Sequence, residues 1–158
     1  MVFVSKLPVT RITSGGQTGV DRAALDVAIF LELEHGGWCP RNRQAEDGAI
    51  PEIYLLKETA ESDYAIRTEK NVIDSQGTLI LYYSELSGGT KLTRQLAAKH
   101  RRPCTAVDLA EPILPSVIHQ WLHDNRIETL NVAGPRESSC PGISRLAERF
   151  LLQVFASS

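Results

Sequence analysis

The stretch TSGGQTGVDRAALDVA, residues 13–28, joins a short predicted strand to a long predicted helix. The strand covers residues 9–13, and the helix begins at about residue 20 and ends near residue 33. Apolar side chains recur through the helix at a spacing that puts them on one face: Val20, Ala24, Val27, Ala28 and Leu31. The loop between the two elements carries three glycines, so it is either a tight turn or a cradle of backbone amides for an anion.

The alternation of strand and helix continues to the end of the chain. Strands are predicted at residues 38–39, 53–56, 78–83, 104–107 and 129–133, and helices at residues 62–75, 90–100, 115–122 and 143–154. This order predicts an α/β fold: a three-layer, Rossmann-like parallel sheet of about five or more strands with helices on both faces. The 158 residues contain no visible linker, so we expect a single ligand-binding domain over residues 1–158.

Composition restricts the classes of partner. The net charge of −2 argues against a nucleic-acid-binding surface, and no apolar run is long enough to span a membrane. The three cysteines are scattered, so we expect a reduced, cytoplasmic protein without nucleic-acid or membrane partners. The four histidines do not cluster and no zinc spacing is present, so no metal site built from protein side chains is predicted. Whether Cys39 or Cys140 contacts a metal stays open.

Three predicted strands end in loops of unusual composition. Parallel strands point their carboxyl ends to one edge of the sheet, where ligands bind in such folds. Glycines let backbone amides approach a ligand, helix starts favour anions, and Arg136 adds a guanidinium. The loops therefore predict a site for an anionic ligand, formed by Ser14, Gly15, Gly16, Gln17, Thr18, Gly19, Ser87, Gly88, Gly89, Thr90, Gly134, Pro135, Arg136, Glu137 and Ser138.

Each part of this site also has a purely structural explanation. The adjacent glycines of the first loop could form a plain turn. Thr18 and Asp21 have the spacing of a capping box, which would make Asp21 a helix cap instead of a ligand contact. Arg136 could pair with the neighbouring Glu137 at the surface. The dinucleotide, P-loop and serine-hydrolase signatures are absent from these loops, so those three enzyme classes are disfavoured.

Four segments carry a resemblance to a known family: ITSGGQTGVDRAALDVA (residues 12–28), GGWCPRNRQAEDG (36–48), TLILYY with the following SGGT (78–83 and 87–90), and LNVAGPRES (130–138). They resemble the putative molybdenum carrier family, which is related to a nucleotide-binding superfamily that includes the lysine-decarboxylase-like, cytokinin-activating enzymes. The resemblance implies a Rossmann-like sheet with glycine-rich loops at its ligand edge, often in a homo-oligomer. It also implies a candidate ligand, the molybdenum cofactor, which is a pterin (molybdopterin) carrying a phosphate and a dithiolene-bound molybdenum.

The resemblance places the same three loops in the site, with one departure. In the cytokinin-activating enzymes a PGGxGTxxE loop supplies a catalytic glutamate. Here SGGT is shorter, and Thr93 and Arg94 stand where that acid would be sought, which weakens a phosphoribohydrolase hypothesis. Arg67, on the helix before the central strand, is a further candidate partner for a phosphate or carboxylate, or else an ordinary solvated arginine.

The leading hypothesis is a binding or carrier protein for a phosphorylated, nucleotide-like or pterin ligand. Glycine-loop amides would surround the phosphate, Thr18 and Thr90 would add hydroxyl bonds, and Arg136 would balance charge. One alternative is a hydrolase for an N-glycosidic or phosphate bond of a nucleotide, with Asp21 or Glu137 as acid or base. Another is a nucleotide-sensing regulatory module. The lack of evident acid–base machinery favours the carrier.

Overall fold

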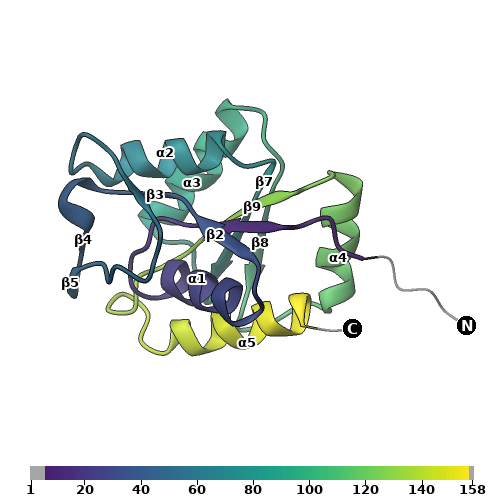
Figure 1. Cartoon of the computed structure of the whole chain (residues 1–158). Coiled ribbons are helices and arrows are strands. Elements are labelled where there is room, and N and C mark those ends of the chain that lie inside the picture. Colours follow the sequence, from purple (N-terminus) through teal and green to yellow (C-terminus); the bar gives the residue numbers. More distant parts are fainter. Residues whose placement is uncertain (1–5, 157–158) are drawn as a thin grey trace, which may run out of the picture.

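The computed structural model describes residues 6–156, whose centre is a sheet of five parallel strands (Figure 1). The strands run in the order β2-β1-β9-β7-β8 across the sheet. In the register, Ile12 lies between His35 and Leu130, and Leu79 lies between Thr105 and Val132. The predicted α/β fold is confirmed, with bounds β1 Arg11–Thr13, β2 Glu34–Gly36, β7 Gly77–Tyr82, β8 Cys104–Asp108 and β9 Thr129–Ala133.

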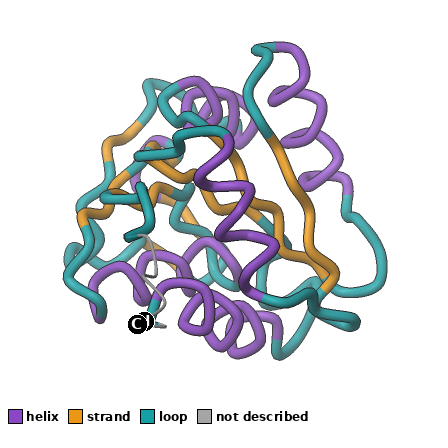
Figure 2. The backbone as a smooth tube through the Cα atoms, turned by 90° about the vertical axis from the view of Figure 1, so that its right-hand side faces the viewer, coloured by secondary structure: helices purple, strands orange, loops and turns teal. Residues whose placement is uncertain are grey.

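Helices cover both faces of the sheet (Figures 1 and 2). On one face α1 (Val20–Phe30) packs along α5 (Ile143–Phe155), and α4 (Pro115–Asp124) lies beside α5. On the other face α2 (Tyr64–Ile73) packs against α3 (Gly88–Lys99). Pro115 is the first residue of α4, where its missing N–H and fixed φ are tolerated.

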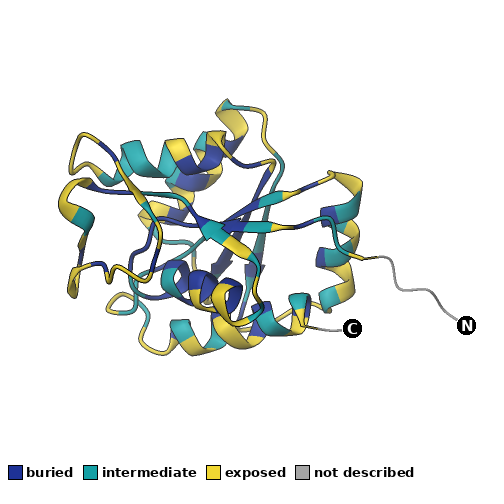
Figure 3. Ribbon diagram, in the orientation of Figure 1, coloured by how far each residue is buried: buried dark blue, intermediate teal, exposed yellow. Residues whose placement is uncertain are grey.

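The two faces of the sheet differ in chemistry, although residues on both are buried; the central strand β7 is largely dark in Figure 3. The face under α1 and α5 is apolar and belongs to the main core, with Ile12, Leu79, Leu81, Leu130 and Val132. Alternate residues of the same strands, Thr13, Thr78 and Asn131, are buried and polar on the opposite face. The Thr13 and Ser75 hydroxyls lie 3.1 Å apart, and Asn131 Nδ2 donates to Thr78 Oγ1 at 3.3 Å. The face toward α2 and α3 is therefore suited to polar contacts.

A long excursion between the second strand and α2 wraps the end of the sheet. It holds the parallel pair β3 (Trp38–Cys39) and β6 (Lys57–Glu58), the 3₁₀ turn η1 (Arg41–Arg43), and the hairpin of β4 (Gln44–Ala45) with β5 (Gly48–Ala49). A second apolar cluster anchors it to α1: Leu25, Cys39, Ala45, Ile50 and Tyr54. The Arg43 guanidinium donates to four carbonyls of this excursion, those of Ile50, Pro51, Tyr54 and Leu56.

Several predicted boundaries are wrong. The first helix ends at Phe30 because Glu32 adopts a positive φ of 58°, and the residues after it form β2, which was not predicted. No strand forms at 53–56; instead, Ile53 and Leu55 are exposed and the strand lies at 57–58. The cap of α2 is Asp63, whose carboxylate accepts the Ala65 N–H at 2.8 Å, in place of Ser62.

Among residues 6–156, no helix combines the length and the apolarity that crossing a bilayer requires.

Candidate functional site

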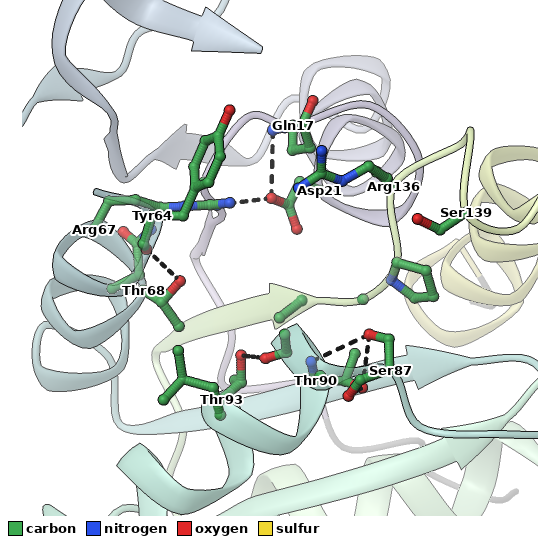
Figure 4. Close-up of a pocket in the computed structure, with 18 of the residues that line it drawn as sticks. Gln17, Asp21, Tyr64, Arg67, Thr68, Ser87, Thr90, Thr93, Arg136 and Ser139 are labelled. Carbon is green, nitrogen blue, oxygen red and sulfur yellow. Dashed lines mark hydrogen bonds and ion pairs between the residues drawn. The ribbon is translucent and has the colours of Figure 1, made fainter. Parts of the chain in front are cut away.

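A cavity of about 480 Å³ opens at the carboxyl edge of the sheet between α2 and α3. All three glycine-rich loops contribute to it, and Figure 4 shows their side chains around a common hollow. The following predicted residues line this cavity: Gly15, Gln17, Arg67, Ser87, Gly88, Gly89, Thr90, Gly134, Pro135, Arg136 and Ser138, together with Asp21. Segments far apart in the sequence are thus brought together as the parallel topology requires.

In the first loop, Gly15 makes room for an ion pair. Arg67 Nη1 lies 2.9 Å from Asp21 Oδ2, and both side chains are largely buried. A Cβ at residue 15 would lie only 1.2 Å from Arg67 Nη1, so a side chain there would displace the guanidinium from this position. Asp21 Oδ2 also accepts the Gln17 N–H at 3.3 Å. Arg67 is therefore an ion-pair partner at the cavity wall and not a solvated helix arginine.

The predicted capping box is not formed. Gly19 is the N-cap of α1, and no side chain caps that helix end. The Thr18 hydroxyl instead donates to the Glu46 carboxylate and accepts the Glu137 N–H at 3.2 Å. Burial raises the pKa of Asp21 above its ordinary value of 3.8, while Arg67 acts in the opposite direction. A buried carboxyl with a perturbed pKa in a cavity is a feature that functional sites often share.

Five predicted site residues do not line the cavity; they hold its loops in place. The Ser14 hydroxyl donates to the Asp21 carbonyl at 2.8 Å, and Gly16 and Gly19 adopt positive φ of 78° and 81° in close contact with neighbouring segments. Thr18 joins the first loop to the third. The Glu137 carboxylate accepts the N–H groups of Gly142 and Ser144 at 2.6 and 3.0 Å, at the start of α5. Glu137 therefore neither pairs with Arg136 nor faces the cavity.

The second loop leads into α3, whose first two residues, Gly88 and Gly89, carry no side chains. Ser87 caps α3 by accepting the Thr90 N–H at 3.3 Å. A Cβ built at Gly88 or Gly89 would meet no atom within 4 Å, so packing does not require glycine at either position. The first N–H groups of a helix have no intrahelical partner and carry a partial positive charge. Both glycines line the cavity, where they leave these amides accessible.

Arg136 supplies the uncompensated charge. Over residues 6–156, no acidic oxygen lies within ion-pair distance of its guanidinium. Its guanidinium carbon lies 5.6 Å from the centroid of the Tyr64 ring, and that of Arg67 lies 5.5 Å from it. Asp21 neutralises Arg67, so Arg136 is the lining side chain whose charge has no ion-pair partner among the described residues; Arg136 also helps to lower the pKa of the nearby Glu46 carboxyl.

Comparisons with known proteins identify the family of the chain. The family model of the circularly permutated YpsA SLOG family matches residues 12–155. The chain belongs to this family. A crystal structure of a putative molybdenum carrier protein from Syntrophus aciditrophicus SB is 45% identical, covers 97% of this chain and 98% of its own, and superposes with a TM-score of 0.92. No functionally curated protein matches the chain. The resemblance found in the sequence is confirmed at the level of family and fold.

The strand order of this YpsA SLOG chain becomes a common doubly wound order when the chain is counted from a later strand. When strands are counted from β7, through β8 and β9 to β1 and β2, the order across the sheet becomes 2-1-3-4-5. That order is one of the two common doubly wound arrangements, whose ligand crevice lies where the order reverses. The reversal falls between β9 and β7, where Asn131 and Ala133 of β9 line the cavity.

Several residues that line the cavity were not predicted as site residues: Tyr64, Ala65, Thr68, Asn71, Leu92, Thr93, Asn131, Val132, Ala133 and Ser139. The sequence held one signal, because asparagine is depleted in strands and Asn131 sits in the middle of TLNVA. Three buried side-chain atoms in the described part of the chain have no hydrogen-bond partner: Gln17 Nε2, Arg67 Nε and Asn131 Oδ1. All three belong to residues that line this cavity.

The cysteines lie elsewhere. Cys39 is buried in the second apolar cluster, and neither it nor Cys140 lines the cavity. Burial raises the pKa of the Cys39 and Cys104 thiols, which keeps them protonated. In residues 6–156 no three histidine, cysteine, aspartate or glutamate side chains are grouped so that they could hold a metal ion.

Proposed function

We propose that this chain binds and carries a phosphorylated small molecule in the cavity between α2 and α3. The observation that carries the proposal is the unpaired Arg136 guanidinium in the same cavity as the side-chain-free start of α3. A phosphate would accept hydrogen bonds from the Gly88 and Gly89 amides and from Arg136. Charge-assisted bonds of this kind are about twice as strong as neutral ones.

Within this proposal, the molybdenum cofactor is the named candidate cargo. The donor set fits its phosphate, and the cavity volume of about 480 Å³ falls within the range of small-molecule sites. The solved relative is named a putative molybdenum carrier protein, which supports the same class of cargo. No cysteine or histidine lines the cavity, so in this proposal the metal would arrive on the pterin and not be coordinated by these side chains.

The proposal is tested by ligand binding to the purified chain. We expect nucleotides or pterin phosphates to raise the melting temperature, because a ligand that binds only the folded state stabilises it by mass action. Native mass spectrometry of the protein as purified would identify retained cargo and count subunits, for which a homo-oligomer is expected. A panel of nucleotides, pterin phosphates and oxyanions that gives no shift and no bound mass would refute the proposal.

Replacing Arg136 tests the anionic end directly. Arg136→Ala is expected to weaken binding of every phosphorylated ligand by about 1.5–3 kcal/mol, since it removes a charge-assisted hydrogen bond. Isothermal titration calorimetry measures this loss. Arg149→Ala is the matched control, because Arg149 is exposed on α5 and does not line the cavity. Equal dissociation constants for wild type and Arg136→Ala would remove Arg136 from the site.

A further inference from the structure

The inner part of the cavity presents hydrogen-bond acceptors. The Thr68 hydroxyl donates to the Tyr64 carbonyl at 2.8 Å, and the Thr93 hydroxyl donates to the Gly89 carbonyl at 3.0 Å. A hydroxyl has one hydrogen, so both oxygens can only accept from a ligand. Asn131 Oδ1 is a third acceptor, because its Nδ2 already donates to Thr78 and no described group donates to Oδ1.

These acceptors lie away from the anionic end. Asn131 is two residues before the end of β9, which is about 6–7 Å below the edge of the sheet. Thr93 is one helical turn beyond the start of α3. Figure 4 shows Thr68 and Thr93 on one side of the cavity and Arg136 with Ser139 on the other. The acceptors of Thr68, Thr93 and Asn131 thus lie apart from Arg136, and Arg67 beside Thr68 adds an unpartnered Nε donor on their side.

The buried acceptor Asn131 Oδ1 requires a hydrogen-bond donor. Asn131 is only 2% exposed, and buried polar atoms in native proteins almost always have a partner. A bare oxyanion would not provide one, because it would face three oxygens that have no hydrogen to share. A ring that carries N–H groups would provide it.

We propose that Asn131, with Thr68 and Thr93, selects a ring with adjacent N–H donors while the mouth holds the phosphate. The chemistry that fits is the 2-amino-4-oxopyrimidine edge, which guanine nucleotides and pterins share. Asn131 is then a specificity-determining residue of the cavity. This inference rests on the proposed function, since it assumes that the phosphate binds at Arg136 and the start of α3.

The test compares ligands with the same sugar and phosphate whose rings differ in their N–H donors and in the 6-oxo group. GMP carries ring and amino N–H groups, whereas purine riboside 5′-monophosphate has the same sugar and phosphate and no N–H on its ring. Calorimetry on wild type should show GMP, or 6-hydroxymethylpterin phosphate, binding about tenfold or more tightly than purine riboside monophosphate. Comparison of GMP with the pterin phosphate then distinguishes the two sources of the shared edge.

Variants tie the preference to the acceptors. Asn131→Leu should reduce the ratio of the affinities for GMP and purine riboside monophosphate toward one, because it removes the acceptor that only a ring with N–H groups can use. Thr93→Val, which is nearly isosteric, should reduce it in the same direction and serves if Asn131→Leu fails to fold. Gln153→Leu, exposed on α5, is the control and should keep the wild-type ratio.

The outcomes separate the two levels of the hypothesis. Equal binding of GMP, the pterin phosphate and purine riboside monophosphate by wild type, all weakened by Arg136→Ala, would overturn the role of Asn131 and leave the proposed function intact. A preference that survives both Asn131→Leu and Thr93→Val would also overturn it. Failure of all three compounds to bind would reject both the proposed function and this inference.

Discussion

Two glycines at the edge of the cavity have different roles: one makes room for a protein side chain, and the other leaves room for a ligand. Gly15 is needed by the protein, because the guanidinium of Arg67 occupies the place of its side chain. Gly88 has no protein atom near that place and faces the cavity instead. The sequence could show that glycines gather here. It could not show this division, because Arg67 and Asp21 are 46 residues apart and only the fold brings them together.

This difference is testable with one methyl group at each position. Gly15→Ala should destabilise the protein by about 3–5 kcal/mol, because displacing Arg67 leaves Asp21 buried without its partner. Gly88→Ala should leave stability equal or higher by up to about 1 kcal/mol, since alanine is the better helix former, yet it should weaken binding of phosphorylated ligands. Urea unfolding and calorimetry measure the two effects. Equal stability of the two variants would contradict the assigned role of Gly15.

At the level of elements, the β4–β5 hairpin links the first and third loops of the cavity by hydrogen bonds. The Glu46 carboxylate, at the hairpin turn, accepts the hydroxyls of Thr18 and Ser138 and the Ser138 N–H. Its own N–H donates to Gln17 Oε1 at 2.9 Å. The sequence did not predict this hairpin, because its residues are largely polar and no apolar period marks them. We call these hydrogen bonds of Glu46 with Thr18 and Ser138 the clasp; its partners lie 28 and 92 residues away in the sequence.

The clasp predicts that the stability of the folded protein depends on pH. Hydrogen bonds from Ser138 and Thr18 hold the pKa of Glu46 below its ordinary value of 4.5. A lowered carboxyl pKa adds stability above the unfolded-state pKa, and this stability is lost as the pH falls through the folded-state value. Wild type should therefore be more stable than Glu46→Gln at pH 7, and the difference should shrink below about pH 4.5 and vanish at lower pH.

Urea unfolding of both proteins across that range measures the difference. Glu148→Gln, exposed on α5, is the control for loss of a surface carboxylate. A gap between wild type and Glu46→Gln that stays constant from pH 7 to pH 3 would contradict the clasp.

For the whole molecule, local patterns predicted most of the elements and the parallel sheet but not the order of its strands. Apolar periodicity marks α1 and α5, and β-favouring runs mark β7 and β9. The order β2-β1-β9-β7-β8 depends on which faces pack together, which no local run encodes. The polar face under α2 and α3 was missed for a similar reason: the buried Asn131 makes sense only with the cavity that it lines.

The permuted strand order predicts that the natural ends of the chain can be joined and new termini introduced at another loop. Leu7 and Phe155, near the two ends, pack against the same apolar core. A flexible linker between residues 156 and 6 with new ends at Glu61 and Ser62 would make β7 the first strand of the sheet. Both residues at the new ends are exposed, and the Asp63 cap of α2 is kept.

This permutant should unfold cooperatively and lose only about 1 kcal/mol, because exchanging one loop closure for another changes the closure entropy little. It should also keep the ligand preference of wild type, since all three loops of the cavity stay intact. Thermal unfolding by circular dichroism and calorimetry with GMP measure both properties. A non-cooperative melt would show that the natural connection before α2 is needed to hold α2 and the excursion on the sheet.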